Sequence, residues 1–169
     1  MSNRARILAL AAACSAVCSA APAAAVTQNA SVTANVVKPL TLTSLQNLDL
    51  GTITLKLGSW SSATAGISRT GVLSCNANLI CTGLTQVARY KVTGSNKQTV
   101  TITAPNVVLT NQSDSTKTLT LVVDSPGQVV LTSSGEPGNN FDLGGSITLS
   151  PSVASGTYQG SFNVTVDYQ

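Results

Sequence analysis

Residues 156–169 read GTYQGSFNVTVDYQ, and apolar and polar residues alternate along nearly all of this sequence. One side of the alternation carries Tyr158, Gly160, Phe162, Val164, Val166 and Tyr168, and the other carries Gln159, Ser161, Asn163, Thr165, Asp167 and Gln169. Successive side chains of a strand point to opposite faces, so the pattern predicts one long β-strand with a buried and a solvent-facing side. On this face we expect Phe162 and Val164 to be buried together with Val100 and Ile102.

Comparable short segments, separated by Gly, Pro, Asn and Ser, occur through the rest of the chain. We expect strands in 26–37, 40–45, 48–57, 71–75, 81–92, 98–104, 107–109, 119–123, 129–131 and 141–149, the last interrupted at Gly144-Gly145. The Ser-rich segment Gly58–Arg69 is expected to be irregular. Many short strands divided by turn residues predict an all-β fold, an antiparallel β-sandwich rather than a parallel sheet.

The N-terminus has the pattern of a secretory signal peptide. Arg4 and Arg6 precede an uncharged apolar run, and small residues follow it up to Ala25. The alternatives are a membrane-spanning helix, for which the run is short, and a lipoprotein anchor on Cys14 or Cys18. We therefore expect residues 1–25 to be removed and residues 26–169 to form one exported domain in the periplasm, at the cell surface or outside the cell, without a transmembrane segment.

Two cysteines, Cys75 and Cys81, remain after such cleavage. In an oxidising compartment, cysteines this close together favour a disulfide that closes a small loop. A metal site would need further ligands, but the chain has no His and no second Cys pair in the mature part. A redox centre is disfavoured because the spacing is not Cys-x-x-Cys.

The sequence offers little for catalysis. Without His, neither a Ser-His-Asp triad nor a Cys-His pair can form, and the six acidic residues are scattered, so we expect no enzyme activity and no cofactor. Scattered charges without a basic cluster also argue against nucleic-acid binding. Oxygen ligands for Ca²⁺ are grouped only at Asp114 with Asn111 and at Asp142 with Asn139 and Asn140, and these are interpreted as turn residues.

Three pairs of segments resemble a widespread family of small exported bacterial domains of undefined function. They are Val36–Leu40 with Leu48–Ile53, Tyr90–Gly94 with Val100–Pro105, and Leu143–Leu149 with Gly156–Tyr168. The last segment also resembles the end of chaperone-usher pilins and of spore-coat-like secreted domains, with Gly-x-Tyr opening the final strand and an aromatic residue next to the C-terminus. The resemblance implies an immunoglobulin-like sandwich and a surface or fimbrial subunit with a role in cell adhesion. Unlike in pilins, the two cysteines lie close together in mid-chain.

Assembly by such a subunit would use the segment Val26–Val36. Its alternating Ala30, Val32, Ala34 and Val36 would enter shallow pockets of an incomplete sandwich, and its backbone would pair with an exposed sheet edge. The partners would be identical or related subunits and a periplasmic chaperone. The alternative is that Val26–Val36 is the first strand of its own sandwich.

A second hypothesis is a secreted monomeric binding module for carbohydrate or another surface ligand, using the Gly58–Arg69 loop and its single Trp, Trp60. A Trp in a polar loop contacts a ligand in some proteins and covers the core in others, so the sequence leaves both readings of Trp60 open.

Overall fold

The computed structural model describes residues 25–169. The predicted signal peptide, with Cys14 and Cys18, therefore falls almost entirely outside the described residues. The chain divides into two units, Met1–Asn35 and Val36–Gln169, and the strands all belong to the second.

The second unit is built from short strands, as the alternating sequence pattern predicts. Within residues 25–169 they are β1 (Thr41–Gln46), β2 (Thr52–Leu55), β3 (Ala63–Ile67), β4 (Leu73–Cys75), β5 (Leu79–Thr82), β6 (Ala88–Thr93), β7 (Thr99–Thr103), β8 (Val107–Asn111), β9 (Thr118–Asp124), β10 (Gln128–Val130), β11 (Asn139–Leu149), β12 (Tyr158–Gln159) and β13 (Thr165–Tyr168), and this part of the chain holds no helix. All pairings among them are antiparallel. The all-β, antiparallel fold class is thereby confirmed.

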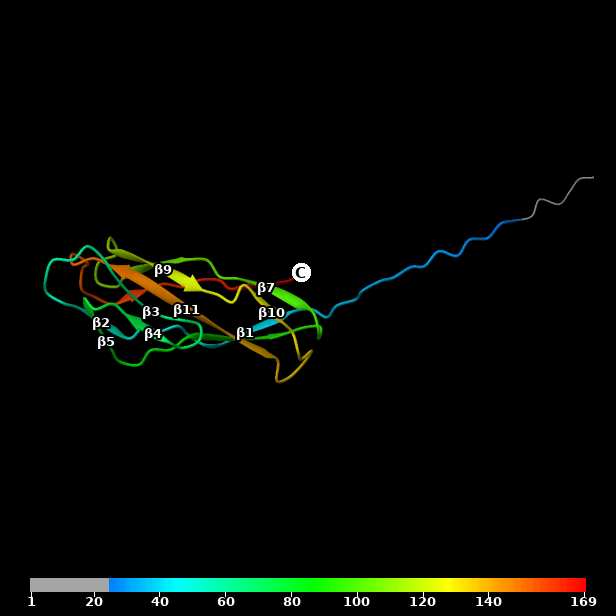
Figure 1. Ribbon diagram of the computed structural model, residues 1–169, viewed down its shortest axis with the longest axis horizontal. Helices are drawn as coiled ribbons and strands as arrows, with labels where there is room; N and C mark the ends of the chain where they lie inside the picture. Colours follow the sequence, from blue (N-terminus) through cyan, green and yellow to red (C-terminus); the bar gives the residue numbers. More distant parts are fainter. Residues whose placement is uncertain (1–24) are drawn as a thin grey trace, which may run out of the picture. The chain divides into compact units, whose positions relative to one another are not determined.

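The strands form three sheets (Figure 1). The largest has the order β1-β6-β11-β9-β8-β12, with β3 and β4 added beside β11. A second sheet has the order β10-β7-β13, and β2 pairs with β5 in the third. β11 joins the large sheet together, because its first half pairs with β6 and its second half lies between β3 and β9.

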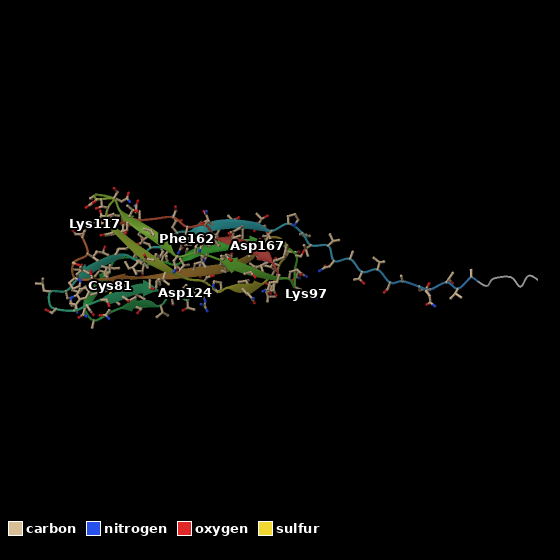
Figure 2. All side chains as sticks on the ribbon, turned by 90° about the horizontal axis from the view of Figure 1, so that it is seen from above. Cys81, Lys97, Lys117, Asp124, Phe162 and Asp167 are labelled. Atoms are coloured by element: carbon tan, nitrogen blue, oxygen red, sulfur yellow. A yellow bond between two sulfur atoms is a disulfide. The ribbon has the colours of Figure 1, made fainter. Side chains whose placement is uncertain are left out.

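The buried side chains form two clusters. Cluster 1 consists of Ala63, Ala65, Leu79, Val107, Leu119, Leu121, Ile147 and Leu149. Cluster 2 consists of Ala88, Val92, Val100, Ile102, Leu131, Phe141 and Leu143. Phe162 packs against both clusters, and Figure 2 places it between the end that carries Cys81 and Lys117 and the end that carries Lys97 and Asp167.

The segment Gly58–Arg69 is not irregular throughout, so this expectation was wrong. Its residues 63–67 form the inner strand β3, which pairs with β11 on one side and β4 on the other. Three of its five residues are small, namely Ala63, Ala65 and Gly66, and a Cβ on Gly66 would lie only 2.5 Å from the carbonyl oxygen of Gly145. Close backbone packing therefore favours Ala and Gly at these positions, and only Thr64 and Ile67 are β-branched residues of the kind that usually indicates a strand.

The expected interruption at Gly144-Gly145 was also wrong. β11 is continuous over eleven residues and includes both glycines. A Cβ on Gly144 would overlap the backbone of Ile67, Ser68 and Arg69. These glycines allow a close approach between neighbouring segments without ending the strand.

The segment Val26–Val37, expected to be a strand, has no strand pairing among residues 25–169, where the first strand begins at Thr41. Val26, Val32 and Val36 are 82%, 92% and 90% exposed. The interpretation of Val26–Val36 as an integral first strand is therefore wrong for the chain as it stands. The physical reason is that a strand forms only where its backbone groups meet a partner edge, and no strand of the described residues supplies one to this segment.

Candidate functional site

The C-terminal segment pairs with β8 at its start and with β7 at its end, and it is not one uninterrupted strand. β13 pairs with β7, with Thr165 opposite Thr103, and β12 pairs with β8, with Gln159 opposite Thr110. The two registers differ by one residue. The change of register occurs where Ala104-Pro105-Asn106 joins β7 to β8. The C-terminal segment opposite this connection is Gly160–Val164, which forms no strand. Pro105 cannot donate a backbone hydrogen bond, so an interruption of the ladder here is expected.

The predicted alternation along this segment is nevertheless present. Tyr158, Phe162, Val164, Val166 and Tyr168 are half-buried and contact the two clusters, while the intervening residues are exposed. Gly160 is exposed, contrary to the expectation that it shares the buried face. Phe162 and Val164 pack on the cluster that contains Val100 and Ile102, as predicted, but neither is fully buried.

β12 and β13 are both edge strands. β12 ends the order of the large sheet and β13 ends the order of the three-stranded sheet, so among the described residues each has a strand on only one side. The backbone N–H of Gln169 donates to the carbonyl oxygen of Thr99. Hydrogen-bonded and non-hydrogen-bonded pairs alternate along an antiparallel ladder, so Asp167 and Thr101, two residues further along, also form a hydrogen-bonded pair. The backbone groups of Val166 and Tyr168 consequently point away from β7, toward the unpaired edge.

A second half-buried row comes from the beginning of the domain and was not predicted as part of a site. It consists of Leu40, Leu42, Leu48, Leu50, Ile53 and Leu55, which pack against the same two clusters. β1, like β13, ends the order of its sheet. We call these six residues and the five half-buried residues of the C-terminal segment, together, the apolar seam. The alternation of Leu48–Leu55 was the sequence signal from which this row could have been recognised.

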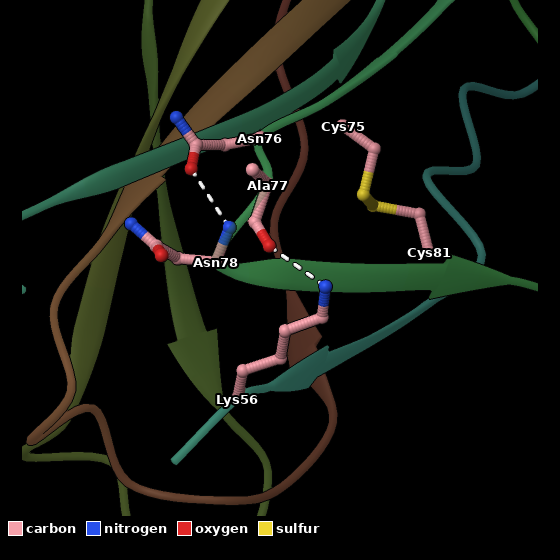
Figure 3. Close-up of a disulfide and its surroundings, with 6 residues drawn as sticks. All are labelled: Lys56, Cys75, Asn76, Ala77, Asn78 and Cys81. Atoms are coloured by element: carbon pink, nitrogen blue, oxygen red, sulfur yellow. Dashed lines mark hydrogen bonds between the residues drawn. A yellow bond between two sulfur atoms is a disulfide. The ribbon is translucent and has the colours of Figure 1, made fainter. Parts of the chain in front are cut away.

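The predicted disulfide is confirmed. Cys75 and Cys81 are bonded, with their Cα atoms 6.1 Å apart (Figure 3). Because β4 belongs to the large sheet and β5 pairs with β2, the bond connects two sheets. The intervening turn is closed by the side chain of Asn76, which accepts from the N–H of Asn78 at 2.9 Å, and Lys56 Nζ donates to the carbonyl of Ala77 at 2.8 Å. The cysteines thus have a structural role.

Trp60 lies at the edge of the core. Its ring is half-buried against cluster 1, and its Nε1 donates to the carbonyl oxygen of Lys56 at 3.1 Å. The one hydrogen-bond donor of the indole is therefore used within the chain. This arrangement favours the interpretation of Trp60 as a core-covering residue over a ligand-contacting one.

Of the two groups of oxygen ligands, only the first belongs to a turn, where Asn111 at the end of β8 and Asp114 hold the chain. Asn111 Oδ1 accepts from the N–H groups of Ser113 and Asp114, and Asp114 accepts from the hydroxyl and N–H of Thr116. The hydroxyl bond, followed by the backbone bond, lowers the pKa of the Asp114 carboxyl. The second group, Asn139, Asn140 and Asp142, lies in β11, so its interpretation as turn residues was wrong. There the Asn139 side chain accepts from the N–H and hydroxyl of Thr132, and Asp142 binds Arg89. In the part of the chain that the structure describes, no three metal-ligating side chains form a group.

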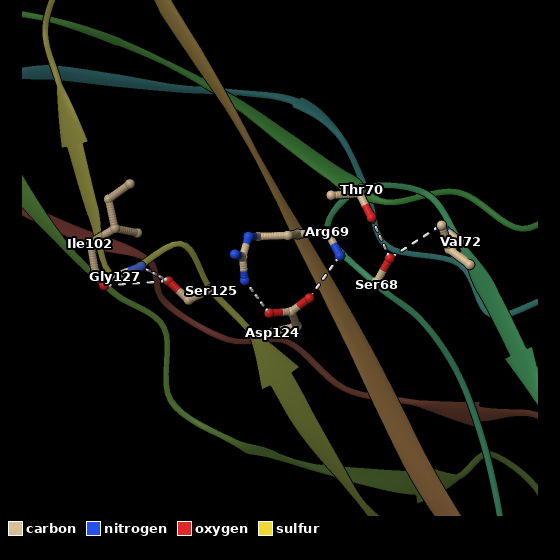
Figure 4. Close-up of polar contacts among 8 residues, drawn as sticks. All are labelled: Ser68, Arg69, Thr70, Val72, Ile102, Asp124, Ser125 and Gly127. Carbon is tan, nitrogen blue, oxygen red and sulfur yellow. Dashed lines mark hydrogen bonds and ion pairs between the residues drawn. The ribbon is translucent and has the colours of Figure 1, made fainter.

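A surface hollow of about 480 Å³ is lined by Arg69, Thr70, Arg89, Pro126, Asn140, Phe141 and Asp142. Its arginines are already paired: Arg89 binds both oxygens of Asp142, which raises the pKa of the guanidinium first by hydrogen bonding and then by charge. Arg69 binds Asp124 through its backbone N–H and its guanidinium, both at 2.8 Å (Figure 4). These exposed pairs join β6 to β11 and the segment after β3 to the end of β9, and they leave little charge for a ligand.

Residues 25–169 contain no helix long and apolar enough to cross a membrane. The model of the family described as "Domain of unknown function (DUF4402)" matches residues 40–168, which is the range from the residue before β1 to the end of β13. The chain therefore belongs to this family. The comparison with curated proteins and the comparison with solved structures give no match.

Proposed function

We propose that the chain is an exported structural subunit of a bacterial surface appendage or matrix, and that its copies join by strand pairing. In this proposal the segment Val26–Val36 of one copy, which we call the arm, pairs with the unpaired edge of the C-terminal segment of another. The observation that carries the proposal is the combination of this unpaired edge with the half-buried apolar seam beside it.

The acceptor side offers both kinds of interaction that an added strand needs. The backbone groups of Val166 and Tyr168 face the edge and would supply hydrogen bonds, and the seam would supply apolar contacts for alternate side chains. An edge of this kind tends to pair with any available strand. An exported subunit would therefore need a temporary cover, which is the role we assign to a periplasmic chaperone.

The donor side fits the acceptor in pattern and in length. Val26–Val36 and Tyr158–Tyr168 both span eleven residues. Ala30, Val32, Ala34 and Val36 are all exposed and lie on one side of an extended chain. Burying a Val side chain that is exposed in the free subunit contributes about 1.5 kcal/mol, so several small residues together favour the pairing appreciably.

Two lysine substitutions in the arm test this proposal. Val32→Lys places a charge on the side that enters the seam, and burial of an unpaired charge is costly. Thr33→Lys introduces the same charge one residue later, on the opposite side. Electron microscopy and size-exclusion chromatography of the exported protein should show polymers for the wild type and Thr33→Lys but monomers for Val32→Lys. Polymers of equal length from both variants would rule out insertion of this side of the arm.

A further inference from the structure

Three hydrogen bonds of 2.7 Å join Tyr168, Ser95 and Lys38. The Tyr168 hydroxyl donates to the carbonyl oxygen of Lys38 and accepts from the backbone N–H of Ser95. The N–H of Lys38 in turn donates to the hydroxyl of Ser95. Tyr168 belongs to β13, on one side of the apolar seam, and Lys38 lies three residues before β1, on the other side. The hydroxyl therefore bridges the two rows of the seam at the end where the arm of the same chain begins.

The bridge also fixes the direction of the chain before β1. β1 pairs with β6 with Thr41 opposite Thr93, and continuing this register places Pro39 opposite Ser95. The bond from Lys38 N–H to Ser95 agrees with that continuation. Lys38 is thus held in line with β1, and both of its backbone polar groups are occupied.

The direction of the chain at Lys38 affects whether the seam can receive the arm of its own subunit or the arm of another copy. To enter its own seam, the arm would have to reverse direction between Val37 and Leu40, as in a β-hairpin with β1, and pass the end that Tyr168 bridges. An arm from another copy does not depend on a turn at Lys38. We propose that the Tyr168 bridge blocks insertion of a subunit's own arm and so reserves the seam for the arm of another copy. This inference rests on the proposed function and makes Tyr168 a positioning residue for assembly.

Tyr90 provides a matched control for the loss of a tyrosine hydroxyl, because it lies outside the apolar seam. It is also half-buried, and its ring stacks on Phe141 with the ring centroids 5.6 Å apart. Tyr168→Phe removes the bridge and keeps the ring on cluster 2, whereas Tyr90→Phe removes a hydroxyl on β6 and leaves the bridge in place. Ser95→Ala is a second way to loosen Lys38, in case Tyr168→Phe does not fold by circular dichroism.

The test measures assembly and protection of the arm in the full exported chain. Tyr168→Phe should shift the protein at least tenfold from polymer toward monomer in size-exclusion chromatography with light scattering, and the arm of this monomer should resist limited elastase digestion because it occupies its own seam. Ser95→Ala should shift in the same direction, and Tyr90→Phe should assemble like the wild type. Adding Val32→Lys to Tyr168→Phe should make the arm cleavable again.

The outcomes separate this inference from the proposed function. If Tyr168→Phe polymerises like the wild type, or is monomeric with a cleavable arm, the blocking role of the bridge is refuted while strand exchange stands. If the wild type is monomeric in the assay, both proposals fail.

Discussion

Phe162 illustrates how much a single half-buried residue contributes to this fold. It is the C-terminal side chain that packs against both buried clusters, although the backbone around it carries no strand. The alternation in the sequence placed it correctly on the apolar face. Its incomplete burial could not be read from the sequence, because burial depends on whether another strand covers the same face.

Phe162→Ala should lower the free energy of unfolding by about 3 kcal/mol, at the low end for loss of a phenyl ring because this ring is half-buried. Asn163→Ala, at an exposed neighbouring position, should change it by less than about 0.5 kcal/mol. Urea titration of both variants measures the difference. Equal losses would mean that the assignment of faces in this segment is incorrect.

A second prediction concerns the glycines that allow close packing. Gly144→Ala should destabilise the domain by roughly 1–3 kcal/mol, because its Cβ would overlap backbone atoms that cannot move independently. Gly135→Ala is the control, since a Cβ at that position meets nothing within 4 Å. Thermal unfolding should separate the two variants clearly, and similar melting temperatures would argue against the close approach of β11 to residues 67–69.

The strands with large alternating side chains were predicted well from the sequence. The strands whose residues are determined by contact with a distant segment of the same chain were not. β1, β7, β9 and the ends of the C-terminal segment lie where alternation predicts them. β3 was missed because its small residues reflect contact with β11, which is distant in sequence. The one-residue slip near Pro105 was missed because it arises from the pairing of two segments rather than from either segment alone.

The disulfide provides a prediction at the same scale. Cys75→Ser/Cys81→Ser should lower the free energy of unfolding by about 2 kcal/mol, since the bond closes a short loop, with a sequence separation of six residues. The fold should remain, because β3, β4 and β5 also pair with neighbouring strands, and β3 and β5 contribute buried side chains. Guanidinium unfolding with and without reductant checks this. No change in the wild type upon reduction would show that the bond contributes nothing.

For the whole molecule, the sequence predicted the all-β class, while the two edge strands beside the seam became visible only in the structure. The arm shows most clearly what alternation in a sequence cannot predict. Its alternation indicates a strand, but a strand forms only with a partner edge. Within residues 25–169 the arm has no such pairing. The family match begins at residue 40, after the arm.

Deletion of Val26–Val36 distinguishes a donor arm from an integral strand. The remaining residues contain both buried clusters and all of the strands within the described part of the chain. The truncated protein should therefore keep its β-type circular dichroism signal and a cooperative melting transition, and it should be monomeric in size-exclusion chromatography while the full chain polymerises. Loss of the β signal and of cooperative melting would contradict the account, because the arm would then be an integral strand of its own sandwich.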